Sequence, residues 1–425
     1  MLWLPLLAAF LYLMAGCRED KETSIPVIQF DTPQFRQEFT VLDTIAVKAL
    51  ITDRQNITYV KVNLTDANFV PISSSLTYSP DAPSFELETR LWIEDATLAS
   101  GTYHVLVRAE NESAFKNKYQ EVLLHGIEQE FRQLLIITEG GFSKVRVSGT
   151  HDFDLVQELF TIQGDYAASA ISQAHQLLFM AGQNSPNIQA WSLSGNTLAW
   201  EVELPPGQPV HSKDCLYFGE SLYATYHHDF IRGYSPEGML QFNVFTDESD
   251  APENVHRIGD YVLVDMQKKN IADAYLATYF AGTGNLKQKR FISFDVVRFH
   301  AGGENVVYIT ANGNGTGKIY SYDVVSDILT PEKELDAGVN CSVMTESGTI
   351  ILGCDAAIYA FSTIQGTLVK VLDEGAETMA FEHLDGSLVM GSDLKVEVYQ
   401  FPEMVNQKTL LFSDPILDLL IQYSK

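Results

Sequence analysis

Acidic and imidazole side chains recur in the short polar segments between apolar runs in the C-terminal two-thirds of this 425-residue chain. Carboxylates that converge in a concavity attract a metal ion, an amine or a basic protein surface. Asp and Gly are also favoured in turns for backbone reasons alone, so a purely structural explanation stays open. The candidate ligand-face residues are Asp165, Tyr166, His227, His228, Asp229, Asp247, Asp250, Asp336, Asp355, Glu374 and Glu377.

Two cysteines form a candidate disulfide. Cys341 and Cys354 flank a turn at Ser347-Gly348 and would lie directly opposite each other in a symmetric hairpin. Opposite residues of antiparallel strands have Cα atoms about 4.5–5.5 Å apart, which permits a disulfide. Two buried free thiols are the alternative, because Cys also packs as a small apolar residue. Cys215 would remain unpaired in either case.

Motifs of the common enzyme classes are missing from the chain. It contains no G-x-S-x-G elbow, no phosphate-binding P-loop, no H-E-x-x-H and no C-x-x-C pair. Carboxylates are plentiful, but no spacing singles out a pair for glycoside hydrolysis. We therefore expect a protein without a catalytic site.

Short apolar segments separated by turns fill residues 131–425, and they repeat. Between Val339 and Asp373 four such segments follow one another, as in one antiparallel blade of a β-propeller. The second strand of each repeat is predicted to begin at 38- to 45-residue intervals, which is the period of propeller blades. The predicted starts are Leu134, Leu177, Leu222, Tyr261, Val306, Thr349 and Ser387, and they indicate seven blades.

The two ends of this region predict how the ring closes. The first repeat lacks an inner strand, whereas the apolar run at residues 416–423 belongs to no repeat. Placing this last run in the vacant position would remove the exposed strand edges. The prediction is an all-β chain whose propeller is closed by its C-terminal strand.

Five histidines recur near the turns between first and second strands of the repeats. The spacing would suit a ring of metal ligands, but ligands also need converging geometry and supporting hydrogen bonds. Inheritance of a polar turn residue explains the same spacing, and whether a metal binds stays open. The five are His175, His211, His256, His300 and His383.

In the segment His227-His228-Asp229, neighbouring side chains of a strand point opposite ways, so only one of the two histidines could form a site with Asp229.

The third and fourth strands carry a shared pattern of an aliphatic residue, a small residue, an aromatic residue, a turn and a second apolar run. It occurs at 188–200, 231–240, 319–323 and 358–368. This pattern resembles the repeat of PQQ-like and YncE-like propellers, and the aromatic residue is expected to pack between blades. Quinoprotein dehydrogenases of that kind typically have eight blades and an adjacent-cysteine disulfide. This chain has neither feature, so no cofactor is expected.

Residues 25–127 alternate between apolar and polar side chains, as in strands with one buried face. About seven such strands in about 100 residues suggest a small β-sandwich. The pieces at 43–47 and 101–105 resemble bacterial immunoglobulin-like domains. The resemblance implies either a spacer or a second binding module.

The N-terminus carries an export signature. The apolar run at 2–15 is too short to span a bilayer, and it ends in Leu13-Met14-Ala15-Gly16-Cys17. This ending resembles a lipobox, which implies a signal peptide at 1–16, acylation of Cys17 with chains such as palmitate, and a tether at 17–24. An ordinary signal peptide is the alternative. The acidic segment 18–22 resembles the surface-export signal of Bacteroidota-type lipoproteins, which implies an outer-membrane, cell-surface location.

The composition of the chain limits the classes of molecule that it can bind. A formal net charge of −27 makes nucleic acid and bare anionic lipid surfaces poor partners, and 46% hydrophobic residues indicate a globular protein. We expect a non-catalytic binding or scaffold lipoprotein, monomeric or part of an envelope complex, that presents a propeller loop face to a protein or a glycan. The alternative is a polysaccharide lyase or hydrolase that uses the acidic face.

Overall fold

The computed structural model describes residues 24–424 except for 68, 70, 74, 94, 96–97, 142, 183–187, 203–211, 227–229, 272 and 304. The described residues contain strands and turns and no helix, so none of them forms a helix that could cross a membrane. The all-β prediction is confirmed. The chain divides into two compact units, residues 1–128 and 129–425, which are described separately below.

In the part of the first unit that the structure describes, two sheets bury a common core. Every second residue of β3 (Thr44–Ile57) is buried at its start, and the same core includes side chains from both sheets. The three-stranded sheet has the order β1 (Val27–Thr32), β3, β6 (Ala82–Trp92). The five-stranded sheet has the order β2 (Gln37–Thr40), β8 (Phe115–His125), β7 (Gly101–Glu110), β4 (Tyr59–Thr65), β5 (Leu76–Tyr78).

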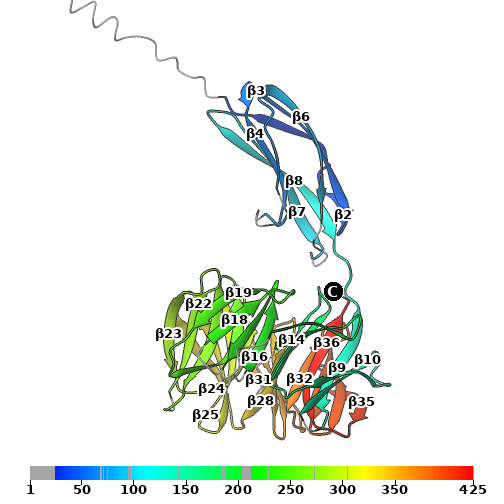
Figure 1. Ribbon diagram of the computed structural model, residues 1–425, viewed down its shortest axis with the longest axis vertical. Coiled ribbons are helices and arrows are strands. Elements are labelled where there is room, and N and C mark those ends of the chain that lie inside the picture. Colours follow the sequence, from blue (N-terminus) through cyan, green and yellow to red (C-terminus); the bar gives the residue numbers. More distant parts are fainter. Residues whose placement is uncertain are drawn as a thin grey trace, which may run out of the picture. The chain divides into compact units, whose positions relative to one another are not determined.

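The described residues of the second unit form seven four-stranded antiparallel sheets, the blades of a β-propeller (Figure 1). The innermost strands contact one another in a closed cycle, which runs β12, β16, β20, β24, β28, β32, β36 and back to β12. Each blade has its own hydrophobic residues on both faces, because each face packs against a neighbouring blade.

The blades follow the chain in order. Blade 1 contains β9 (Phe131–Glu139), β10 (Lys144–Thr150), β11 (Gln157–Gln163) and β36 (Ile416–Tyr423). Blade 2 contains β12 (Ala168–Ser172), β13 (Leu177–Ala181), β14 (Ile188–Ser192) and β15 (Thr197–Val202). Blade 3 contains β16 (Ser212–Phe218), β17 (Ser221–Tyr226), β18 (Phe230–Tyr234) and β19 (Leu240–Phe245). Blade 4 contains β20 (Asp250–Ile258), β21 (Tyr261–Lys268), β22 (Ala274–Phe280) and β23 (Leu286–Ile292).

The remaining blades repeat this plan. Blade 5 contains β24 (Asp295–Ala301), β25 (Val306–Gly313), β26 (Thr316–Asp323) and β27 (Ile328–Leu335). Blade 6 contains β28 (Val339–Met344), β29 (Thr349–Cys354), β30 (Ile358–Ser362) and β31 (Thr367–Leu372). Blade 7 contains β32 (Thr378–Glu382), β33 (Ser387–Ser392), β34 (Lys395–Gln400) and β35 (Val405–Leu411).

Five of the seven predicted starts of second strands match these bounds. The predicted start at Leu134 falls three residues late, and the one at Leu222 falls one residue late.

The ring is closed by β36, which pairs antiparallel with β9 and forms the inner strand of blade 1, as predicted. The two strands share buried side chains, among them Leu134 and Ile136 of β9 and Leu419 of β36. This pairing joins the end of the unit to its beginning. The edge of β9 that faces the propeller axis is therefore covered by β36 and is not left unpaired.

Aromatic residues of the repeated pattern reach the preceding blade, which confirms their predicted place. Trp191 stacks on Phe160 of blade 1, with ring centroids 4.6 Å apart. The ring of Phe361 lies 6.4 Å from that of Tyr308 in blade 5. A single blade is too thin to bury these rings, so neighbouring blades share them.

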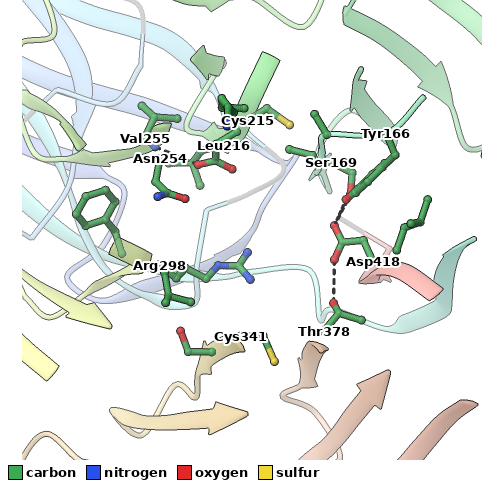
Figure 2. A pocket seen from close by; sticks show the side chains of 18 of the residues that line it. Tyr166, Ser169, Cys215, Leu216, Asn254, Val255, Arg298, Cys341, Thr378 and Asp418 are labelled. Carbon is green, nitrogen blue, oxygen red and sulfur yellow. Dashed lines mark hydrogen bonds between the residues drawn. The ribbon is translucent and has the colours of Figure 1, made fainter. Parts of the chain in front are cut away.

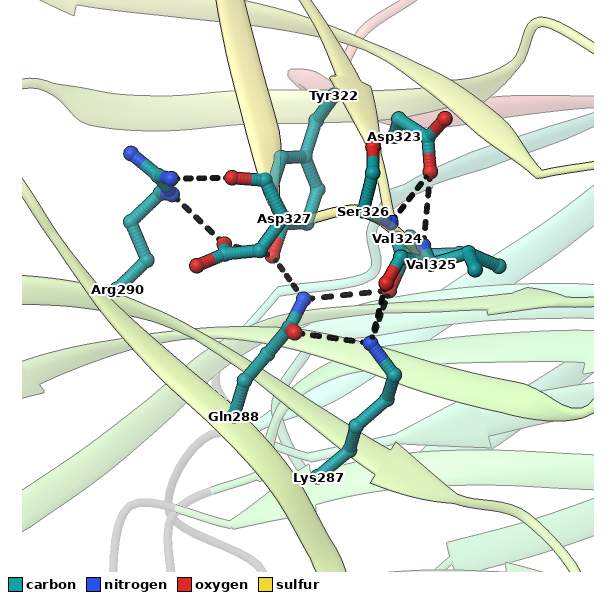
Figure 3. Close-up of polar contacts among 9 residues, drawn as sticks. All are labelled: Lys287, Gln288, Arg290, Tyr322, Asp323, Val324, Val325, Ser326 and Asp327. Atoms are coloured by element: carbon teal, nitrogen blue, oxygen red, sulfur yellow. Dashed lines mark hydrogen bonds and ion pairs between the residues drawn. The ribbon is translucent and has the colours of Figure 1, made fainter.

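Polar contacts also join neighbouring blades. Figure 3 shows the junction between β23 of blade 4 and the turn that follows β26 of blade 5. The Nε atom of Arg290 lies 2.7 Å from Oδ1 of Asp327, and Nζ of Lys287 donates to the carbonyl oxygens of Val324 and Val325 at 2.8 and 2.9 Å. Gln288 Nε2 donates to the Tyr322 hydroxyl at 2.7 Å. The turn is therefore fixed by side chains of the adjacent blade.

The predicted disulfide between Cys341 and Cys354 is wrong for this structure, in which Cys215, Cys341 and Cys354 are all free. A register shift between Val339 and Cys341 places Cys341 opposite Gly353 and Cys354 opposite Val339. A one-residue shift turns a side chain to the other face of the sheet. Cys354 accordingly packs in one hydrophobic cluster with Ile350, and Cys341 packs against another, on the side of Ile351.

Candidate functional site

A cavity of about 290 Å³ lies among the inner strands of all seven blades (Figure 2). Its lining is rich in polar groups, although the blades around it are held together by apolar side chains. The polar lining residues are Tyr166, Ser169, Lys213, Asp214, Asn254, His256, Arg298, Asn340, Ser342, Glu377, Thr378 and Asp418. We call this the axial cavity.

β-Bulges shape the lining of the axial cavity. Five of the seven inner strands break register in their first residues: β16, β20, β24, β28 and β36. A bulge bends a strand and redirects the side chains beside it. Asp214, Asn254, Arg298 and Asp418 all lie within or directly beside a bulge and line the cavity.

Polar side chains of the second strands hydrogen-bond the backbone at three of these bulges. Thr225 Oγ1 of β17 accepts from the backbone N–H of Asp214 at 3.1 Å, and Asp265 Oδ1 of β21 accepts from that of Asn254 at 2.7 Å. In blade 5, Thr310 Oγ1 donates to the carbonyl oxygen of Arg298 at 3.2 Å. Buried backbone groups that the ladder leaves unpaired need such partners. Thr225, Asp265 and Thr310 therefore stabilise the bulges by hydrogen bonds from the adjacent second strands.

Asp418 of β36 connects three blades. Its Oδ2 accepts from the Tyr166 hydroxyl and from Ser169 Oγ, both at 2.6 Å, and its Oδ1 accepts from Thr378 Oγ1 at 3.2 Å (Figure 2). Tyr166 and Ser169 belong to blade 2 and its leading loop, and Thr378 begins blade 7. The carboxylate is therefore supplied with hydrogen bonds by uncharged donors from both flanking blades.

Two carboxyl groups near the axial cavity, Asp214 and Asp265, have raised pKa values. Burial raises the pKa of Asp214 to about 6, against the opposing effect of the hydrogen bond that its Oδ2 accepts from the backbone N–H of Val255 at 3.0 Å. Burial also raises the pKa of Asp265 to about 8, so this group is mainly protonated at neutral pH. Loss of hydration disfavours the charged form of an acid.

Arg298 differs from the other charged groups of the axial cavity. Its side chain is exposed to the cavity, and its guanidinium makes no hydrogen bond or ion pair with any residue that the structure describes. In Figure 2 the side chains of Arg298 and Asp418 point toward the middle of the cavity from opposite sides. A second cavity, of about 560 Å³, is also lined by Arg298 and by His256, so both residues lie where the two cavities adjoin.

The predicted ligand-face residues are only partly brought together. Tyr166 and Glu377 line the axial cavity. Asp355, Glu374 and Glu377 line a neighbouring hollow of about 280 Å³ together with Asn340 and Lys395. His227, His228 and Asp229 lie outside the described residues, as does Cys17.

The other predicted carboxylates do not line these cavities: Asp165, Asp247 and Asp336 lie in loops, and Asp250 is the first residue of β20. Asp336 is exposed between β27 and β28, and Asp165 lies between β11 and β12. Asp247 is exposed beside Lys289, with 3.9 Å between Oδ2 and Nζ. Asp250 is buried and is ion-paired with Lys268 and Lys289.

The histidine spacing does not produce a metal site within the described part of the chain, where no group of three or more potential ligands converges. His256 and His300 are buried within β20 and β24, whereas His175 and His383 lie in turns. His300 Nε2 is 2.9 Å from Ser342 Oγ, and His175 Nε2 is 2.7 Å from Glu220 Oε2. His211 lies outside the described residues.

Sequence reasoning missed Asp214, Asn254, Arg298 and Asp418, because it considered loops and not inner strands. One signal was present for two of them: Arg298 and Asp418 each stand between apolar residues near the start of an inner strand. Comparing the inner strands of the seven repeats with one another would have revealed the shared position.

The strand order, the closed cycle of inner strands and the axial cavity define a seven-bladed β-propeller that follows a smaller all-β unit. No protein-family model matches the sequence, and no curated protein is detectably similar to it.

Among solved structures, the WD40 β-propeller domain of Doa1 aligns with a TM-score of 0.49 and 13% identity, over 61% of this chain and 86% of that one. BamB from Moraxella catarrhalis aligns with a TM-score of 0.43 and 12% identity, over 68% and 93% of the two chains. Sqt1 from Saccharomyces cerevisiae aligns with a TM-score of 0.45 and 11% identity, over 60% and 77%. The propeller assignment rests on the strand order of this chain itself.

Proposed function

We propose that this protein is a non-catalytic binding lipoprotein of the bacterial outer membrane. It is anchored through acylated Cys17, and it presents the propeller face around the axial cavity to a glycan or a protein. The first unit is an immunoglobulin-like spacer in this proposal. The lipobox-like segment and the acidic residues after it support the anchor and the surface location.

The axial cavity is the observation that carries the binding function. Small-molecule sites are usually preformed concavities with a few polar groups that fix the ligand's orientation. Here all seven blades contribute side chains to one preformed concavity, and one of them, Arg298, has a guanidinium without a partner among the described residues. Hydrogen-bonding groups held in place by strands lose little entropy on binding.

The carboxylates of the cavity favour binding over catalysis. A glycosidase needs an acid and a second carboxylate that both address the substrate. Asp418 is occupied by Tyr166, Ser169 and Thr378, and Asp214 accepts from the Val255 backbone. These groups hold neighbouring blades together, so their place in the cavity has a structural explanation.

A binding comparison on the purified full-length protein tests the function. We expect binding on an array of neutral and acidic glycans, or to an envelope protein recovered by crosslinking in cells. Glu377→Lys, which changes the cavity rim, should weaken that binding, whereas Glu403→Lys in the turn between β34 and β35 should not. Equal binding by both variants, or release of reducing ends from a polysaccharide by the wild type, would contradict the proposal.

The anchor has its own test in cells. Wild-type protein should incorporate labelled palmitate and be cleaved by protease added outside intact cells. Cys17→Ala should lose the label and leave the membrane fraction. Labelling that persists in Cys17→Ala would refute the proposed attachment site.

A further inference from the structure

Strand β19, the outer strand of blade 3, has an open edge. It pairs with β18 on its inner side, and no other described strand pairs with its outer side. The N–H and C=O groups along such an edge lack ladder partners, so a further strand can add to them. The outer strands of the other blades have the same place in their sheets, and their sequences show how such an edge is protected.

Charged residues or proline interrupt every other outer strand of the described blades. β11, β15, β31 and β35 each contain one charged residue, β23 contains three, and β27 contains three together with a proline. These residues discourage pairing with a further strand, because a charge would lose hydration there and proline has no N–H to donate. β19, with the sequence Leu-Gln-Phe-Asn-Val-Phe, contains neither, so its edge lacks this protection.

The exposed side chains at both ends of β19 are apolar. Phe242 and Val244 are buried against blade 4, whereas Leu240 is 52% exposed and Phe245 is 74% exposed. Met239, directly before the strand, is 62% exposed. When a strand adds to a sheet, backbone hydrogen bonds supply affinity and alternate side chains supply further contacts. β19 therefore offers both kinds of contact to an incoming strand.

The charges beside β19 determine which strand it suits. Glu237 is exposed before the strand, and Asp247 and Glu248 are exposed after it. Lys289 lies 3.9 Å from Asp247 but is also paired with the buried Asp250. A second copy of this chain would place acidic residues beside acidic residues in either orientation, and like charges across a ladder are unfavourable. A strand with basic residues at its ends is complementary instead.

We propose that β19 is a docking site for an extended segment of another protein. The segment adds to blade 3 as a fifth strand, is uncharged where it lies along β19, and carries lysine or arginine on both sides of this stretch. The site is separate from the axial cavity, which lies among the inner strands, so the inference does not depend on the binding function proposed above.

Hydrogen exchange of the full-length protein with added peptide tests the site. The probe is a short synthetic peptide in which alternating threonine and valine residues stand between two pairs of lysines. At a peptide concentration about ten times its Kd, amide exchange within β19 should slow by about tenfold. One control peptide has glutamates in place of the lysines, and another has proline in place of the central valine. Both should protect β19 far less.

Asn243→Lys places a charge in the middle of β19. It should weaken peptide binding by about tenfold or more, because the charge would be desolvated in the new ladder. Gln407→Lys makes the same change from an exposed amide in β35, which already contains Lys408, and should bind as the wild type does. Phe245→Ser is the second variant. It alters a mostly exposed side chain, so it should fold and should lose part of the affinity.

The inference is overturned if the lysine-flanked peptide does not slow exchange in β19, or if either control peptide protects equally. It is also overturned if folded Asn243→Lys binds as tightly as the wild type or, should that variant not fold, if Phe245→Ser does. Protection that falls mainly on another outer strand would have the same meaning. A dimer that forms without peptide and is lost in Asn243→Lys would overturn the inference by showing that a second copy is the occupant.

Discussion

Gln133 of β9 and Gln422 of β36 bind each other through buried side chains, Nε2 to Oε1 at 2.6 Å, although 289 residues separate them in the chain. Gln422 also donates to Gln176 Oε1 at 2.5 Å, and Gln176 lies in the turn between β12 and β13. The last strand of the propeller is therefore bonded both to its own blade and to blade 2.

Removal of residues 415–425 should destabilise the whole propeller and not only blade 1. The deletion exposes one edge of β9 and removes the link between blades 1, 2 and 7. We expect loss of the cooperative unfolding transition of this unit, measured by circular dichroism or calorimetry. A truncated protein that unfolds at the wild-type temperature would show that closure by β36 contributes nothing.

A point variant gives the same test with less disruption. Leu419→Ala should cost about 2–5 kcal/mol, because it leaves a cavity at a residue that is 2% exposed. Leu411→Ala is the matched control, since Leu411 is 80% exposed, and it should change the free energy of unfolding by less than about 0.5 kcal/mol. Urea titration measures both, and equal effects of the two would contradict the packing described for β36.

Asp418→Ala should destabilise the unit by about 1–3 kcal/mol, because three hydroxyl donors lose their shared acceptor. Tyr166→Phe removes only one of these donors and should cost less. Adding the two changes together should cost less than the sum, since they act on the same hydrogen bond. If the two changes in the free energy of unfolding were strictly additive, Tyr166 and Asp418 would not stabilise the unit through this shared hydrogen bond.

Asp265 should make stability fall as the pH rises. Its pKa is raised to about 8 in the folded protein, so between the ordinary Asp value and 8 the folded state holds a proton that the unfolded state releases. This contribution is complete below about pH 4 and is lost as the pH approaches 8. Asp214, with a pKa of about 6, acts in the same direction over the lower part of that range.

Asp265→Asn isolates this effect. The amide oxygen can still accept from the Asn254 backbone but has no proton to lose, so the drop in stability between pH 5 and pH 8 should be smaller than in the wild type. The lowered pKa of His256 makes the fold less stable as the pH falls toward 4, in the wild type and in Asp265→Asn alike. The wild type and the variant are therefore compared with each other at each pH. Parallel pH profiles of the free energy of unfolding would rule out the raised pKa.

Cys341 and Cys354 should react as free thiols. Denatured protein treated with an alkylating reagent without reductant should carry the label at both positions, measured by mass spectrometry. In the native protein the reaction should be slow, because burial raises the pKa of Cys341 to about 12 and also raises that of Cys354. A mass that shows alkylation only after reduction would mean that the hairpin has shifted its register.

The alternation of apolar and polar residues determined most of the fold. A residue such as Ile45 is buried because the strand alternates, and this property is visible in a short window of sequence. The repeat period located the blades within a few residues, and the unassigned run at 416–423 revealed the closing strand. A repeat period and a strand without a repeat of its own can both be recognised from the order of segments along the chain. Neither requires knowledge of the tertiary packing.

The polar lining of the axial cavity was decided by the tertiary structure. Arg298 and Asp418 face the same space only because seven separate inner strands meet at one axis and because bulges redirect their first residues. A bulge shifts the register by one residue, and this small change also separated Cys341 from Cys354. Such shifts depend on backbone hydrogen bonds to partners such as Thr225 and Asp265, which lie in neighbouring strands and leave no periodic trace in the sequence.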